Sequence, residues 1–164
     1  MKNVNREGPG LLALLLDHHG IGYDVVDLDK DEVFPDPTKY AAMVVLGGPD
    51  SANDQTPKMT AELPAVKKAV DAGMPYLGIC LGLQVLVRAM GGKVVKNHVP
   101  EIGFFDPDGQ PYRVELTVDG QQDPLFAELD AALRVFHLHG ETVELATGMT
   151  LLAPLPEPSR ACRP

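Results

Sequence analysis

Nine residues, Tyr76-Leu77-Gly78-Ile79-Cys80-Leu81-Gly82-Leu83-Gln84, join a short apolar strand to a segment that favours a helix. Cys80 stands at the junction, with a glycine two positions before it and another two positions after it. This pattern indicates a nucleophile elbow, a strained turn that requires neighbours with almost no side chain. A helix that begins near Leu81 would direct its N–H groups at the sulfur and favour the thiolate. The pattern predicts a reactive Cys80, and a buried structural cysteine is the alternative.

The composition is that of an ordinary globular protein that acts on a small molecule. With 164 residues, of which 45% are hydrophobic, the chain suits one domain. A net charge of −9 argues against a nucleic-acid partner. No apolar run is long enough for a membrane span, and the polar start does not resemble a signal peptide. Cys80 and Cys162 are too few and too far apart for a disulfide framework, so we expect a cytoplasmic protein.

Strand-like and helix-like segments alternate, which predicts an α/β fold with a three-layer, doubly wound sheet that is mostly parallel with antiparallel additions. The expected helices are 10–17, 60–72 and 81–90, with a short helix opening at Asp123. Pro64 is expected in the first turn of the second helix. The expected strands are 23–28, 41–46, 76–79, 93–96 and 112–118, and residues 29–39 are expected to form a loop.

Both ends of the chain fit such a fold poorly. Residues 2–5 offer a single apolar side chain, Val4, where a doubly wound fold needs a buried strand. Residues 153–160 carry three prolines, which cannot occupy a central strand. We therefore expect residues 1–164 to form a single domain that is incomplete at both ends.

Five segments in order carry a resemblance to a known family. They are Arg6-Glu7-Gly8-Pro9-Gly10, Val44-Val45-Leu46-Gly47-Gly48-Pro49, Gly78-Ile79-Cys80-Leu81-Gly82-Leu83-Gln84, Glu101-Ile102-Gly103-Phe104-Phe105 and His139-Gly140-Glu141-Thr142. Together they resemble the class I glutamine amidotransferases, especially the free-standing, GMP-synthase-like branch. The Gly-Ile-Cys-Leu-Gly-x-Gln elbow is the most specific of these motifs. The resemblance implies the flavodoxin-like fold of that family.

The resemblance also implies a reaction and a set of residues. Glutamine or a γ-glutamyl compound would be hydrolysed through a Cys80 glutamyl thioester, and the ammonia would pass to an acceptor on a synthetase partner. The implied oxyanion donors are the backbone N–H groups of Gly48 and Leu81, and Gln84 would contact the substrate. A tight turn is the alternative role for Gly48, and a solvated helix position is the alternative for Gln84. No cofactor and no metal are expected.

Two residues are candidates for the acid–base partner of the cysteine. His139 and Glu141 have the His-x-Glu spacing of such a pair. In the relatives, however, the matching His-Gly-Asp-Thr segment precedes the catalytic histidine, which lies in a later Phe-His-Pro-Glu segment, and nothing after Arg160 resembles that segment. His139 and Glu141 are therefore candidates, with a role in lining a pocket or fixing a loop as the alternative. Alternation places His137 on the same strand face as His139.

Two further functions remain open. The chain is either a catalytically impaired or non-catalytic amidotransferase-like protein or fragment, or a cysteine-elbow hydrolase or chaperone of the DJ-1/PfpI type. In the DJ-1/PfpI group the cysteine is usually not followed by Leu-Gly-x-Gln. Because a positioned histidine is missing from the pattern, we expect slow or absent glutamine hydrolysis by these 164 residues.

Overall fold

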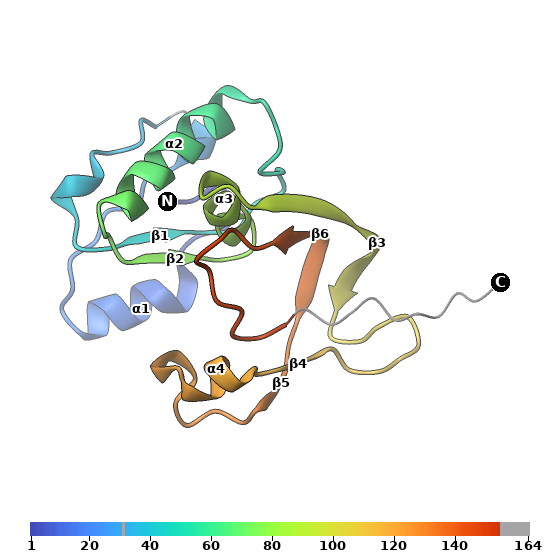
Figure 1. Cartoon of the computed structure of the whole chain (residues 1–164). Helices are drawn as coiled ribbons and strands as arrows, with labels where there is room; N and C mark the ends of the chain where they lie inside the picture. Colours follow the sequence, from blue (N-terminus) through green and yellow to red (C-terminus); the bar gives the residue numbers. More distant parts are fainter. Residues whose placement is uncertain (31, 155–164) are drawn as a thin grey trace. The chain divides into compact units, whose positions relative to one another are not determined.

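The computed structural model describes residues 1–30 and 32–154 (Figure 1). The chain forms two compact units, an N-terminal unit (Met1–Gly92) and a C-terminal unit that begins at Lys93. Cys162 and most of the proline-rich segment lie outside the described residues. The single domain expected from the sequence therefore stays a prediction.

A small parallel sheet lies at the centre of the N-terminal unit. Strand β1 (Met43–Val45) pairs with β2 (Tyr76–Gly78) in parallel, which confirms the two strands expected at 41–46 and 76–79. Residues 1–3 continue the sheet beyond β1, since Leu46 donates to the Met1 carbonyl at 3.1 Å and Lys2 donates to Val26 at 2.9 Å. The first residues thus take a strand-like place through their backbone, although they offer little apolar surface. The strand expected at 23–28 is wrong in extent, because only Asp27 forms a bridge, to Lys2.

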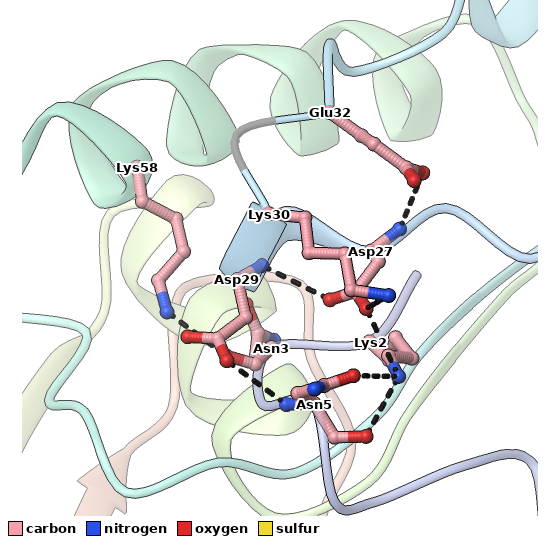
Figure 2. A network of polar contacts seen from close by, with 8 residues as sticks. All are labelled: Lys2, Asn3, Asn5, Asp27, Asp29, Lys30, Glu32 and Lys58. Atoms are coloured by element: carbon pink, nitrogen blue, oxygen red, sulfur yellow. Dashed lines mark hydrogen bonds and ion pairs between the residues drawn. The ribbon is translucent and has the colours of Figure 1, made fainter.

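Polar contacts hold this N-terminal segment in place (Figure 2). The Lys2 ammonium lies 3.1 Å from the Asp27 carboxylate and donates to the Asn5 carbonyl at 2.8 Å. The Asn5 N–H donates to Asp29 at 3.1 Å, and the Lys58 ammonium donates to the Asn3 carbonyl at 2.9 Å. These bonds satisfy backbone groups that a longer sheet ladder would otherwise pair.

Helices cover both faces of the sheet in this unit. Helix α1 (Gly10–His18) lies on one side, and α2 (Pro57–Asp71) and α3 (Leu81–Ala89) lie on the other, which gives three layers (Figure 1). Most of the fully buried apolar side chains of this unit belong to β1, α2 and α3, and they include Val45, Met59, Val66, Leu81 and Val85. Helix α1 buries no residue, so the side with α2 and α3 supplies most of the core.

Helix α2 begins three residues earlier than the sequence predicted. The Thr56 side chain accepts a hydrogen bond from the Met59 N–H at 3.2 Å, and Pro57 occupies the first turn. Pro64 is therefore inside the helix, and the prediction that placed it in the first turn was wrong. The loop expected at 29–39 contains two 3₁₀ turns, η1 (Leu28–Lys30) and η2 (Pro37–Lys39).

The C-terminal unit is built on antiparallel ribbons. Strand β3 (Lys93–Gly103) pairs with β6 (His137–Glu144), and β4 (Arg113–Glu115) pairs with β5 (Ala132–Arg134). The strand expected at 93–96 is therefore longer than predicted. The strand expected at 112–118 is shorter, because Thr117 caps helix α4 (Val118–Gln122). Asp123 caps the short helix η3 (Pro124–Phe126), as predicted. None of the helices in the described ranges is long and apolar enough to cross a membrane.

Candidate functional site

Cys80 lies between β2 and α3 in a backbone conformation that L-residues rarely adopt. Its φ is +53° and its ψ is −110°, and it immediately precedes the first residue of α3. Among the described non-glycine residues, only Glu128 also has a positive φ. Such conformations cost on the order of 1–3 kcal/mol and are concentrated at functional sites. The backbone therefore has the geometry of the predicted elbow, and its side chain is exposed.

The two flanking glycines are required by close backbone contacts. A Cβ on Gly82 would lie 2.1 Å from the Val45 carbonyl oxygen, and a Cβ on Gly78 would lie 2.6 Å from the Gly82 backbone. These distances are far below van der Waals contact, so the turn tolerates no side chain at either position. The glycine spacing found in the sequence thus follows from the packing of α3 onto β1 and β2.

The Gly47-Gly48 loop, which follows β1, lies beside the cysteine. A Cβ on Gly47 would lie 3.5 Å from the Cys80 Cβ, and a Cβ on Gly48 would lie 2.9 Å from Asn3 and 3.2 Å from the Leu81 side chain. Gly48 is thus wedged between the N-terminal segment and the start of α3. The loop and the cysteine come together at the carboxyl end of parallel strands, where open α/β sheets bind ligands. The assignment of the Gly48 and Leu81 N–H groups as oxyanion donors stays a prediction.

The electrostatics of Cys80 differ from the expectation. Although the Cys80 side chain is exposed to solvent, the protein atoms around it partly desolvate the thiol, which raises its pKa; a hydrogen bond from the Leu81 N–H lowers this pKa, and the charge of Glu7 raises it again. The helix start does favour the thiolate, as predicted, but the net direction of the pKa is upward. The thiol is therefore the resting form, and its deprotonation needs a base.

Gln84 is buried, with 8% of its surface exposed, which excludes the solvated helix position considered above. Its N–H donates to the Cys80 carbonyl at 3.1 Å, so it follows the cysteine by one turn of α3. A buried amide one turn from Cys80 is compatible with the substrate contact that the resemblance implies. That contact stays a prediction.

The buried side chain of Asn3 packs against Gly48 and forms hydrogen bonds next to the glycine loop. The Asn3 amide donates to the Leu46 carbonyl at 3.2 Å and to the Glu62 carboxylate at 3.4 Å. Glu62 is 1% exposed. Burial raises the pKa of Glu62, and the Asn3 hydrogen bond and the Lys58 charge offset part of that effect. Asn3 thus links the sheet edge at Leu46 to α2, next to the contact with Gly48.

The C-terminal unit holds a second cluster, made of two histidines and one glutamate. The Nδ1 of His137 lies 2.5 Å from the Glu101 Oε2, and the Nε2 of His139 lies 3.1 Å from the same oxygen. The two rings are 5.0 Å apart, as expected for alternate residues on one strand face. Tyr112 stacks on His137 at a centroid distance of 4.7 Å. The cluster is largely buried.

The predicted His139–Glu141 pair is present on β6 but has a different geometry from a catalytic dyad. The Nδ1 of His139 contacts the backbone carbonyl of Glu141 at 3.0 Å, and the imidazole meets a carboxylate at Glu101 instead. Both ring nitrogens of His139 therefore already have partners. His98 lies exposed in β3, and His18 and His19 contact each other at the end of α1.

Three acidic residues of these clusters were missed by the sequence interpretation. Glu101 and Glu7 lie inside motifs that were quoted only for family resemblance. Glu62 could have been noticed, since it falls with Met59 and Val66 on the apolar face of α2. No local pattern could have paired Glu101 with the histidines, because 36 residues separate it from His137.

Residues 11–154 match the family model of the class I glutamine amidotransferases. The glutamine-hydrolyzing GMP synthase of Paraburkholderia phymatum is 32% identical over 127 residues, which cover 76% of this chain and 23% of that protein. The putative glutamine amidotransferase-like protein YfeJ of Salmonella typhimurium is 32% identical over 124 residues, covering 73% of this chain and 49% of that protein. The chain thus spans half or less of these two curated relatives.

Solved structures match closely as well. A glutamine amidotransferase from Methylobacillus flagellatus has a TM-score of 0.84 and 28% identity over 94% of this chain and 59% of its own. A glutamine amidotransferase from Thermotoga maritima has a TM-score of 0.80 and 29% identity over 92% of this chain and 63% of its own. These matches confirm the predicted α/β, flavodoxin-like fold class.

Proposed function

The chain belongs to the class I glutamine amidotransferase family, and on that premise we propose that it hydrolyses the side-chain amide of glutamine, or of a γ-glutamyl compound, through a thioester on Cys80. The observation that carries this proposal is the positive-φ conformation of Cys80 at the start of α3, with the Gly47-Gly48 loop against it. That arrangement supports the proposal of a nucleophile and backbone donors at the sheet edge.

The proposed reaction has two steps. The Cys80 thiolate attacks the amide carbon, the C–N bond breaks, and ammonia leaves with a proton supplied by a general acid. Water then hydrolyses the thioester and restores the thiol. The N–H groups of Gly48 and Leu81 are proposed to stabilise the oxyanion of each tetrahedral intermediate, a contribution of about 3–4 kcal/mol per donor. Gln84 is proposed to contact the substrate.

The proposal includes no residue that is already positioned as the general base for Cys80. The raised pKa of Cys80 makes a base necessary. His139 and Glu141 enter the proposal only as the pair to be tested, since Glu101 and the Glu141 carbonyl already engage both nitrogens of His139. A poorly placed base would lower turnover by about 10²–10⁴-fold. This favours a catalytically impaired amidotransferase-like protein as the second candidate.

The acceptor of the ammonia is proposed from the relatives. Several of them are glutamine-hydrolyzing GMP synthases. We therefore propose a synthetase partner that receives ammonia, in the cytoplasm.

The test is covalent capture of the nucleophile. An electrophilic glutamine analogue should label Cys80, as located by peptide mass spectrometry, and excess glutamine should protect it. Excess glutamate, which lacks the reactive amide, is the matched control and should protect Cys80 less than glutamine does. Labelling that glutamine does not reduce, or that falls on another residue, would contradict the proposed site.

Ammonia release then separates the two candidates. The full chain is assayed with glutamine beside Cys80→Ala and His139→Ala. We expect slow release that Cys80→Ala abolishes and His139→Ala changes little. Fast release that His139→Ala abolishes would instead establish His139 as the acid–base residue.

A further inference from the structure

The register of the β3–β6 ribbon brings Glu101, His137 and His139 onto one face. Glu101 pairs directly with His139, and His137 lies diagonally across from Glu101, two residues earlier in β6. A register shift between Lys96 and Glu101 produces this arrangement, because the register of residues 93–96, continued without it, would place Glu101 opposite Phe136. The irregularity in the strand therefore re-aims the glutamate at the two imidazoles.

The three side chains are close enough to share one ion. One donor atom from each lies within 4.8 Å of the others. In a tetrahedral zinc site with bonds of 2.0–2.1 Å, neighbouring donor atoms lie about 3.3 Å apart. The separations of 2.5 Å and 3.1 Å from the Glu101 oxygen to the two nitrogens need to widen by less than about 1 Å. The three ligand atoms lie within 4.8 Å of one another, so no pair needs to close by more than about 1.5 Å. Side-chain adjustment alone can supply such a movement.

The hydrogen bond of His139 to Glu141 leaves its Nε2 able to bind a cation. A carbonyl oxygen can only accept, so the contact at 3.0 Å with Glu141 requires the proton on Nδ1. In the neutral imidazole this leaves a lone pair on Nε2, directed at a carboxylate oxygen 3.1 Å away. Two acceptors at that distance repel each other unless a proton or a metal ion lies between them. A histidine whose second nitrogen donates to a backbone carbonyl is the usual arrangement at metal centres.

Asn97 and Tyr112 complete the surroundings of the cluster. The atom of Asn97 that lies 3.3 Å from the Nδ1 of His139 is the amide nitrogen Nδ2, which would donate to a lone pair there. With the proton of His139 on Nδ1, the Asn97 amide must be turned by 180° so that its oxygen accepts from that N–H. Tyr112 stacks on His137 with an interplanar angle of 11° and fixes the orientation of that ring. Both imidazoles are therefore held in place before any ion binds.

We propose that Glu101, His137 and His139 bind a divalent first-row transition-metal ion, Zn²⁺ in the first instance. Two imidazole nitrogens and one carboxylate oxygen suit zinc or iron(II), whereas Mg²⁺ and Ca²⁺ prefer oxygen donors alone. Three protein ligands leave at least one position for water or another molecule. The sequence predicted no metal, because Glu101 and the histidines meet only through the strand register.

The experiment measures Zn²⁺ binding by the full chain with isothermal titration and by metal analysis after dialysis. We expect one equivalent, and an affinity at least about 100-fold weaker for Glu101→Gln and for His139→Asn. Two variants serve as matched controls and should bind zinc as the unchanged chain does. They are His98→Asn, whose side chain is exposed on the same strand as Glu101, and the double variant His18→Asn/His19→Asn. Circular dichroism checks the fold of each variant.

Co²⁺ provides an independent readout that requires no substitution. Bound to the unchanged chain, it should show ligand-field bands without a sulfur-to-cobalt charge-transfer band, and Cys80→Ala should leave the spectrum unchanged. Absent binding, a charge-transfer band, or loss of binding only in the His18→Asn/His19→Asn variant would overturn the proposal. Since Cys80 is not a ligand, these outcomes are independent of the labelling test of the proposed function.

Discussion

Replacing Cys80 with glycine should give a more stable N-terminal unit than replacing it with alanine. Both substitutions remove the sulfur, so the difference between them isolates the backbone. Alanine keeps the strain of the conformation at φ +53° and ψ −110°, whereas glycine adopts positive φ without a steric penalty.

The expected magnitude follows from two opposing contributions. Relief of strain contributes about 1–3 kcal/mol. The greater freedom of glycine in the unfolded chain costs about 0.5–1 kcal/mol. The side chain is exposed, so loss of its packing contributes little to either variant. The midpoints of these two ranges make the glycine variant more stable than the alanine variant by about 1 kcal/mol, and their extremes allow up to about 2.5 kcal/mol.

Amide hydrogen exchange of α2 and α3 is the suitable assay, because it reports the opening free energy of this unit separately from the other. Denaturant unfolding followed by circular dichroism provides a second measurement, although two units need not unfold in one transition. Equal stability of the two variants, or greater stability of the alanine variant, would refute the argument that the elbow stores strain.

Three further predictions concern the same unit. Gly82→Ala should destabilise it by about 3 kcal/mol or more, measured by denaturant unfolding, because the new Cβ would lie 2.1 Å from the Val45 carbonyl; Gly22→Ala, which meets no atom within 4 Å, is the control. Glu7→Gln should accelerate alkylation of Cys80 at neutral pH by less than about tenfold, since it removes one charge that raises the thiol pKa; an unchanged labelling rate of the Cys80 peptide, measured by mass spectrometry, would show that the Glu7 charge does not act on the thiol. Because burial raises the pKa of folded Glu62, the contribution of Glu62 to stability should fall as pH rises above the ordinary glutamate pKa, and the stability of Glu62→Gln relative to wild type should increase over that range; a difference that does not change with pH would show that Glu62 is not desolvated.

The elbow could be predicted from the sequence because its constraints are local. Gly78, Cys80 and Gly82 fall within five residues, and the contacts that exclude side chains from the two glycines follow from a strand turning directly into a helix. The helix caps are local signals too, and Asp123 was identified correctly. Thr56 was overlooked, which misplaced Pro64.

Contacts between distant segments decided the rest. Residues 1–3 reach their place beside β1 through backbone hydrogen bonds, which leave no mark on the side-chain pattern. The upward pKa of Cys80 comes from burial and from Glu7, more than 70 positions away in the chain. Glu101 meets His137 and His139 only because β3 is irregular before it pairs with β6. The sequence alone therefore determined the family, the fold class and the turn that carries Cys80, whose causes lie within a few neighbouring residues. Only the tertiary structure decided the charges around the thiol and the histidine cluster, because electrostatic and strand-pairing energies depend on which distant residues come within a few ångströms of one another.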